Sequence, residues 1–134
     1  MTKRPTGHPP PLTTRLHEGE ELDLRDLAKE ICGRYRAEFP DERQRYGDAG
    51  VEWCRHDNQH ILNWAVIACN GFGAIEPRLD WLAGVLDARD FPLERLARNL
   101  EIGAQVVQEV LPPSHLVLSE QLSAGARFVR ARSS

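Results

Sequence analysis

Residues 92–111 read PLERLARNLEIGAQVVQEVL, and their apolar side chains recur at the spacing of an α-helix. Pro92 suits the first turn of a helix, where the backbone N–H that proline lacks would have no intrahelical partner. The apolar side chains form one seam along the helix, which comprises Leu93, Leu96, Leu100, Val107 and Leu111. This spacing predicts an amphipathic helix over residues 92–111, with one face buried against other elements.

The segments on both sides repeat this pattern, with proline and glycine between them. Helices are expected over residues 24–38, 49–70, 77–88, 92–111 and 114–130, with a short helical turn at 41–46. No segment alternates apolar and polar residues for long enough to predict a strand. Short links between amphipathic helices predict an all-α fold, an antiparallel bundle of four to five helices. The proline-rich start is expected to be disordered or extended over residues 1–20, and the bundle to occupy residues 21–134.

The composition fits one domain without a strongly charged partner. The chain has 134 residues, of which 41% are hydrophobic, and its formal net charge is −3. This balance argues against nucleic acid as a partner, and no apolar run is long enough to predict a membrane span. The cysteines have no C-x-x-C spacing and follow no signal peptide, which predicts reduced thiols in a cytoplasmic protein; they are Cys32, Cys54 and Cys69.

Residues 53–64, WCRHDNQHILNW, hold the densest group of functional side chains. At 100° per residue, Asp57 falls on an apolar helix face together with Cys54 and Trp64, and the same face extends to Phe72. A buried carboxylate must be paired or hydrogen-bonded. Asp57 is therefore expected either to tie helices together or to face a ligand or a partner.

The same helix carries a candidate metal clip. His56 and His60 are four residues apart and can meet on one helix face, as two zinc ligands do. No second cluster with ligand spacing supplies the further ligands, so no metal site is expected; an enzyme that uses a metal on His56, His60 and Asp57 is a third, weaker hypothesis. The sequence has no nucleophile elbow, phosphate loop or dinucleotide fingerprint, so neither catalytic residues nor a cofactor is expected.

Trp81 lies off the main apolar stripe of the helix expected over residues 77–88. An aromatic side chain there covers either the last helix or a surface used for binding. The candidate ligand or partner face therefore comprises Trp53, Asp57, His60, Trp64 and Trp81.

Two stretches carry a family resemblance: RYGDAG at residues 45–50 leading to CRHD at 54–57, and WLAGVLDARDFP at residues 81–92 followed by Leu96. Together they resemble the helical domain that precedes the cobalamin-binding domain in many bacterial sensor and regulatory proteins. Asp57 matches that family's aspartate, whereas Ile61 stands where the family has histidine.

The second stretch departs from the family at one functional pattern. Trp81, Arg89 and Pro92 match the family's second motif. Phe91 and Pro92 stand where light-sensing members have the Glu and His that cap the cobalamin. The D-x-H-x-x-G motif of the cobalamin-binding domain does not occur in this sequence.

The resemblance implies a helical bundle with a regulatory or sensory role, acting by protein–protein contact. The expected partner is a second copy of the chain or a separate protein, including a cobalamin-binding protein whose cofactor the face near Trp53, Asp57, His60 and Trp64 would cap. The alternative hypothesis is a globin-like sensor domain of a stress-signalling regulator that binds a small molecule or haem, with His60 as the candidate haem ligand.

Overall fold

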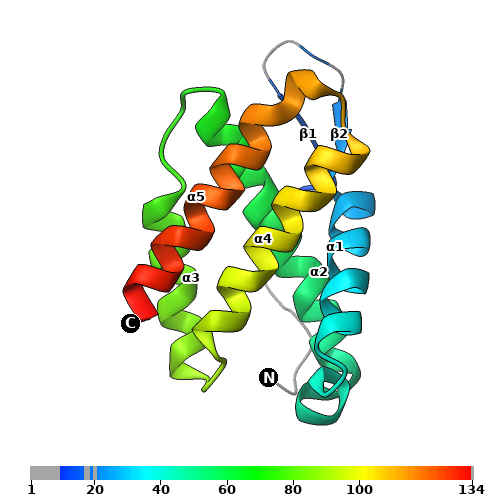
Figure 1. The fold of residues 1–134 in the computed structure, drawn as a ribbon, viewed down its shortest axis with the longest axis vertical. Coiled ribbons are helices and arrows are strands. Elements are labelled where there is room, and N and C mark those ends of the chain that lie inside the picture. Colours follow the sequence, from blue (N-terminus) through cyan, green and yellow to red (C-terminus); the bar gives the residue numbers. More distant parts are fainter. Residues whose placement is uncertain (1–9, 17–18, 20, 134) are drawn as a thin grey trace.

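The fold consists of antiparallel helices with a short hairpin at one end (Figure 1). The structure, a computed structural model, describes residues 10–16, 19 and 21–133. The elements in this part of the chain are β1 Thr13–Arg15, β2 Glu21–Asp23, α1 Leu24–Glu38, α2 Glu42–Cys69, α3 Glu76–Ala88, α4 Leu93–Val110, the 3₁₀ turn η1 Pro113–His115 and α5 Leu116–Ser133. Consecutive helices run in opposite directions, which confirms the predicted all-α antiparallel bundle.

Local signals position α1 as the sequence predicts. The side chain of Asp23 accepts a hydrogen bond from the backbone N–H of Asp26 at 2.9 Å and so caps the helix. The helix ends at Glu38, and Phe39 caps it directly before Pro40, because proline disfavours helical backbone in the residue that precedes it.

The expectation of no strand is wrong for the segment before α1. β1 and β2 form an antiparallel pair in which Thr14 lies opposite Leu22. Each strand has three residues, which is too short to show an alternating pattern. Leu22 is buried and joins the hairpin to the core. Residues 1–9, which open the segment predicted to be disordered or extended, lie outside the described residues.

α4 lies at the centre of the bundle. It packs against α1 on one side and α5 on the other, and α3 packs against both α4 and α5. α2 packs against α1 and α5. The largest fully buried side chains include Leu100 of α4, Ile31 of α1 and Leu122 of α5.

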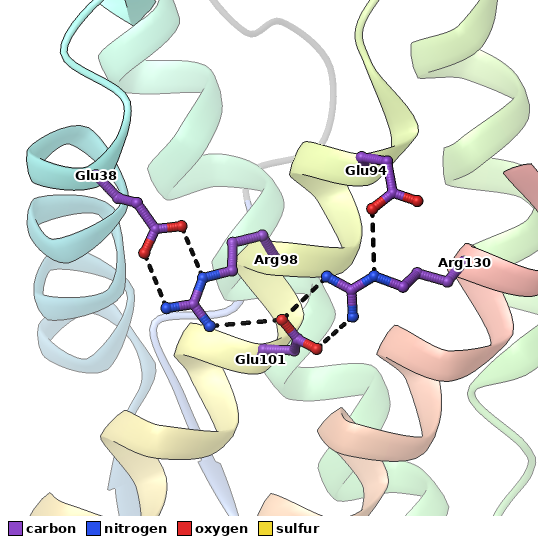
Figure 2. A network of polar contacts seen from close by, with 5 residues as sticks. All are labelled: Glu38, Glu94, Arg98, Glu101 and Arg130. Atoms are coloured by element: carbon purple, nitrogen blue, oxygen red, sulfur yellow. Dashed lines mark hydrogen bonds and ion pairs between the residues drawn. The ribbon is translucent and has the colours of Figure 1, made fainter.

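A chain of charges links α1, α4 and α5 along one side of the bundle (Figure 2). Arg98 donates to both carboxylate oxygens of Glu38, at 2.7 and 2.8 Å. Arg130 donates to Glu101 and, at 3.2 Å, to Glu94. Arg98 also reaches Glu101 at 3.4 Å, so a single network connects the three helices.

Candidate functional site

An open groove of about 600 Å³ separates α2 from α3. Its walls include all five side chains of the candidate face: Trp53, Asp57, His60 and Trp64 from α2, and Trp81 from α3. The three tryptophans are all the tryptophans of the chain. The structure thus brings the five residues, which come from two separate helices, to one surface, called the α2–α3 groove below.

Four aromatic rings follow one another along the α2 wall of the groove. The ring of Trp53 lies 5.4 Å from His56 in an edge-on arrangement, and His56 lies 4.8 Å from His60, also edge-on. His60 then stacks on Trp64 with 5.9 Å between ring centroids. From Trp53 to Trp64 the strip spans eleven residues, or roughly 16 Å at 1.5 Å per residue. The α2 wall is therefore a continuous aromatic strip.

Two arginines, Arg78 of α3 and Arg89 directly after it, bridge the groove near its ends. The guanidinium of Arg89 lies over the ring of Trp53, 5.1 Å from the centroid, and that of Arg78 lies over Trp64 at 5.9 Å. Both contacts have the geometry of cation–π pairs. Because α3 runs antiparallel to α2, the two Arg–Trp contacts close the groove at opposite ends.

Trp81 lies between these two contacts on α3 and is 64% exposed. The structure therefore decides between the two alternatives for this side chain: Trp81 lies on an open surface and does not cover α5. Below it, Leu82 and Leu86 line the groove with apolar carbon and are themselves buried.

The phase of the helix placed Asp57 on the buried apolar face. In the structure, Asp57 is not buried in the apolar core. Its side chain is 19% exposed, lines the groove, and lies 3.2 Å from Nδ1 of His56, a distance at which its carboxylate accepts a hydrogen bond from the ring. Asp57 therefore faces the groove, and its described partner is its neighbour on α2.

The polar residues that α2 buries are Asn58 and Gln59. Asn58 and Asn99 of α4 are 3% and 7% exposed and donate to each other, at 3.0 and 2.8 Å. The buried face of α2 is thus rotated by about one residue from the predicted face. Phe72, which was assigned to that face, is 81% exposed in the link after α2.

His60 lies in the middle of the aromatic strip and is half-buried. Burial lowers the pKa of its imidazole, and the nearby His56 lowers it further, while Asp57 acts in the opposite direction. Because the ordinary pKa of histidine is already below 7, a lowered value keeps His60 uncharged at neutral pH. The ring is then an aromatic and hydrogen-bonding group of the groove, not a cation.

A smaller cavity of about 50 Å³ lies beside the groove and shares Asp57 and Leu86 with it. Its lining is mostly apolar and includes the polar side chains of Asn58 and Tyr46. The hydroxyl of Tyr46 is buried and has no hydrogen-bond partner among the described residues. The cavity has room for a water molecule or a small polar group.

Arg78 and Arg89 belong to the groove but were missed as site residues. Their spacing could have identified them from the sequence, because they are eleven residues apart, as are Trp53 and Trp64. When two antiparallel helices lie side by side and each carries a pair of residues with the same spacing, both residues of one pair can contact both residues of the other. Each arginine taken alone, however, resembles any other exposed basic side chain of a helix.

The residues of the groove suit the binding of a partner or a ligand better than the binding of a metal ion. Among the described residues, no group of three histidine, cysteine, aspartate or glutamate side chains could hold a metal ion. In the same part of the chain, none of the helices combines the length and the apolar character needed to cross a membrane. No protein-family model, curated protein or solved structure matches the chain.

Proposed function

We propose that this chain is a non-catalytic regulatory module that acts by protein–protein contact, with the α2–α3 groove as its contact surface. The convergence of all three tryptophans on this groove carries the proposal. Tryptophan and arginine are the residue types that contribute most to the binding energy of protein interfaces. A core built from other side chains leaves Trp81 available for a partner.

The resemblance to the helical domain of cobalamin-associated sensors supplies the biological setting of the proposal. In that setting the groove covers a cobalamin held by a separate protein, or it contacts a second copy of this chain. Both occupants place an apolar surface against the aromatic strip between Trp53 and Trp64.

A calorimetric titration with two matched variants tests the proposed contact. The chain is titrated against itself by dilution, and against a cobalamin-loaded binding protein of the same organism. Trp81→Ala removes an exposed ring inside the groove, and Phe72→Ala removes one outside its lining. We expect one of the two associations to occur, with Trp81→Ala weakening it about 10-fold or more and Phe72→Ala leaving it unchanged. The absence of both associations, or equal weakening by both variants, contradicts the proposal.

A second candidate function is a sensor that binds a small molecule in the same groove. The observation in its favour is the small cavity that shares Asp57 and Leu86 with the groove, because a flat protein contact does not need such a cavity. Haem is the ligand proposed from the sequence, with His60 as the iron ligand. Titration with haemin tests this form: a sharp Soret band that His60→Ala abolishes supports it, and an unchanged haemin spectrum contradicts it.

A further inference from the structure

We propose that the α2–α3 groove binds a small planar aromatic anion, whose rings lie against the tryptophans and whose anionic group is held by Arg78 or Arg89. This inference rests on the second candidate function, a small-molecule sensor, because it requires the groove to hold a ligand. It adds the chemical class of the ligand and the residues that select it.

The shape of the groove favours a flat aromatic molecule. The α2 wall presents the ring strip from Trp53 to Trp64, and Trp81 projects from α3 within the same groove. Aromatic rings stack on one another or meet edge-on with centroids about 4.5–7 Å apart, so a planar ligand can contact both walls. The groove volume of about 600 Å³ lies within the range of about 300–1,000 Å³ typical of small-molecule sites.

The closed ends favour a small molecule over a helix of a partner protein. Arg89 contacts Trp53 at one end and Arg78 contacts Trp64 at the other, about three helical turns away. A helix that continued beyond this length would have to displace one of these contacts. A ligand that fits between them leaves both in place.

The charges in the groove favour an anion. Neither Arg78 nor Arg89 has a carboxylate partner among the described residues, whereas Arg98 and Arg130 of the bundle are both held in ion pairs. A guanidinium that lies over a ring still directs its N–H groups sideways, where they can bind a carboxylate, sulfonate or phosphate in a bidentate manner. The groove thus carries two cationic groups that have no carboxylate partner in the described part of the chain, although the net charge of the chain is −3.

The acidic side chain of the groove does not cancel this preference. Asp57 already accepts a hydrogen bond from His56, and it also lines the smaller cavity beside the groove. One carboxylate opposes two guanidinium groups, so the lining charges sum to a positive value. A local positive groove on an acidic protein attracts anions and repels cations.

Two probes that differ only in charge test the inference. 1-Anilinonaphthalene-8-sulfonate is an aromatic anion with a planar naphthalene ring, and N-phenyl-1-naphthylamine has the same ring system without the sulfonate. Fluorescence titration gives the dissociation constant of each probe with the full chain. We expect the wild type to bind the anionic probe at a single site, at least about 10-fold more tightly than the neutral probe.

Arginine variants assign the charge preference to the groove. We expect Arg78→Gln or Arg89→Gln, or both, to weaken binding of the anionic probe about 3- to 10-fold and to change binding of the neutral probe less than 2-fold. Arg127→Gln removes an exposed arginine of α5 outside the groove and is expected to change neither. Near-ultraviolet circular dichroism verifies that each variant keeps its tertiary structure.

The remaining outcomes separate this inference from the proposed function. Equal affinity for both probes, or equal loss in the Arg127→Gln variant, overturns the anion preference. If Trp81→Ala then weakens both probes, the groove remains a binding surface and only its charge selectivity is wrong. If Trp81→Ala changes neither probe, the groove is not the binding site, and the inference and its premise both fail.

Discussion

Asn58 and Asn99 form a polar pair inside a mostly apolar core. Each amide donates to the other, and Asn58 also donates to the backbone carbonyl of Cys54 at 3.0 Å. A buried amide without partners is costly, so this pair favours the one arrangement of α2 and α4 in which both amides are satisfied. Because Asp57 precedes Asn58 on α2, the same rotation of the helix turns Asp57 toward the groove.

Replacing both members of this pair is expected to cost less than the two single replacements added together. Asn99→Leu leaves the Asn58 amide without its partner and should lower the free energy of unfolding by about 1–3 kcal/mol. In the double variant Asn58→Leu/Asn99→Leu two apolar side chains face each other, so the loss should be smaller than the sum of the two single losses. Urea denaturation of the three variants gives these values. Strict additivity would show that the two amides do not act as a pair.

The identity of this pair could not be predicted from the sequence. Successive residues of a helix are 100° apart, so a helix with polar groups at both 57 and 58 has two plausible buried faces. The choice depends on Asn99, which lies 41 residues away and has no local signal that marks it. Helical periodicity thus predicted the existence of the face, whereas the tertiary partner determines its rotation.

At the level of the elements, α2 is interrupted at a single glycine. Gly47 has φ 67° and ψ −165°, a backbone conformation that side chains make unfavourable, and the helix continues on both sides of it. The sequence predicted this interruption, with a short helical turn before it and a long helix after it, because glycine weakens a helix locally. The kink places Tyr46 against Phe91, with 5.6 Å between their ring centroids.

A pair of glycine variants tests the role of this backbone conformation. A Cβ at Gly47 or at Gly33 would meet no atom within 4 Å, so the two sites differ in backbone conformation and not in space. Gly47→Ala should destabilise the chain by about 1–3 kcal/mol. Gly33→Ala, in the regular helix α1, should stabilise it by about 0.5–1 kcal/mol. Thermal unfolding gives both shifts, and a stabilising Gly47→Ala would contradict the kinked geometry.

Element boundaries were more predictable than the hairpin. Caps and prolines act locally, which is why the bounds of α1 and the starts of α3 and α4 follow from residues such as Asp23, Pro77 and Pro92. The pairing of Thr14 with Leu22 depends instead on contacts between short segments and on the burial of Leu22 in the core. No periodicity in three residues could reveal it.

Across the whole molecule, the charge network makes stability depend on pH. Hydrogen bonds from Arg130 hold the pKa of Glu101 below its ordinary value, and those from Arg98 do the same for Glu38. The unfolded chain therefore binds more protons than the folded chain as the pH falls below about 4.5, and the free energy of unfolding falls with it. Above that pH the contribution is fully present.

Glu101→Gln is expected to reduce this acid dependence. Because the pair is partly exposed, the loss at pH 7 should be about 0.5 kcal/mol, and it should shrink at high salt. Glu120→Gln, at an exposed position of α5, serves as the control. Urea denaturation between pH 3 and pH 7 gives the comparison. An unchanged slope below about pH 4.5 in Glu101→Gln would show that this carboxylate does not contribute.

The aromatic residues of the groove and Asp57 could be predicted from the sequence, whereas its two arginines could not. Three tryptophans and a histidine at helical spacing identify a face of α2 and a position on α3, because these residue types are uncommon and their spacing is local. Arg78 and Arg89 acquire their meaning from the antiparallel placement of α3 beside α2, which only the assembled bundle provides. The net positive charge of the groove lining therefore depends on the tertiary structure.

The most direct test of the central claim follows the indole N–H signals by nuclear magnetic resonance during titration with 1-anilinonaphthalene-8-sulfonate. Because every tryptophan of the chain lines the α2–α3 groove, these three signals report on that surface alone. The account predicts that all three shift with one common dissociation constant, while the backbone amide of the exposed Lys29 on α1 stays in place. Unshifted indole signals, with changes confined to the exposed apolar residues Val110, Leu116 and Val117 at the α4–α5 link, would contradict it.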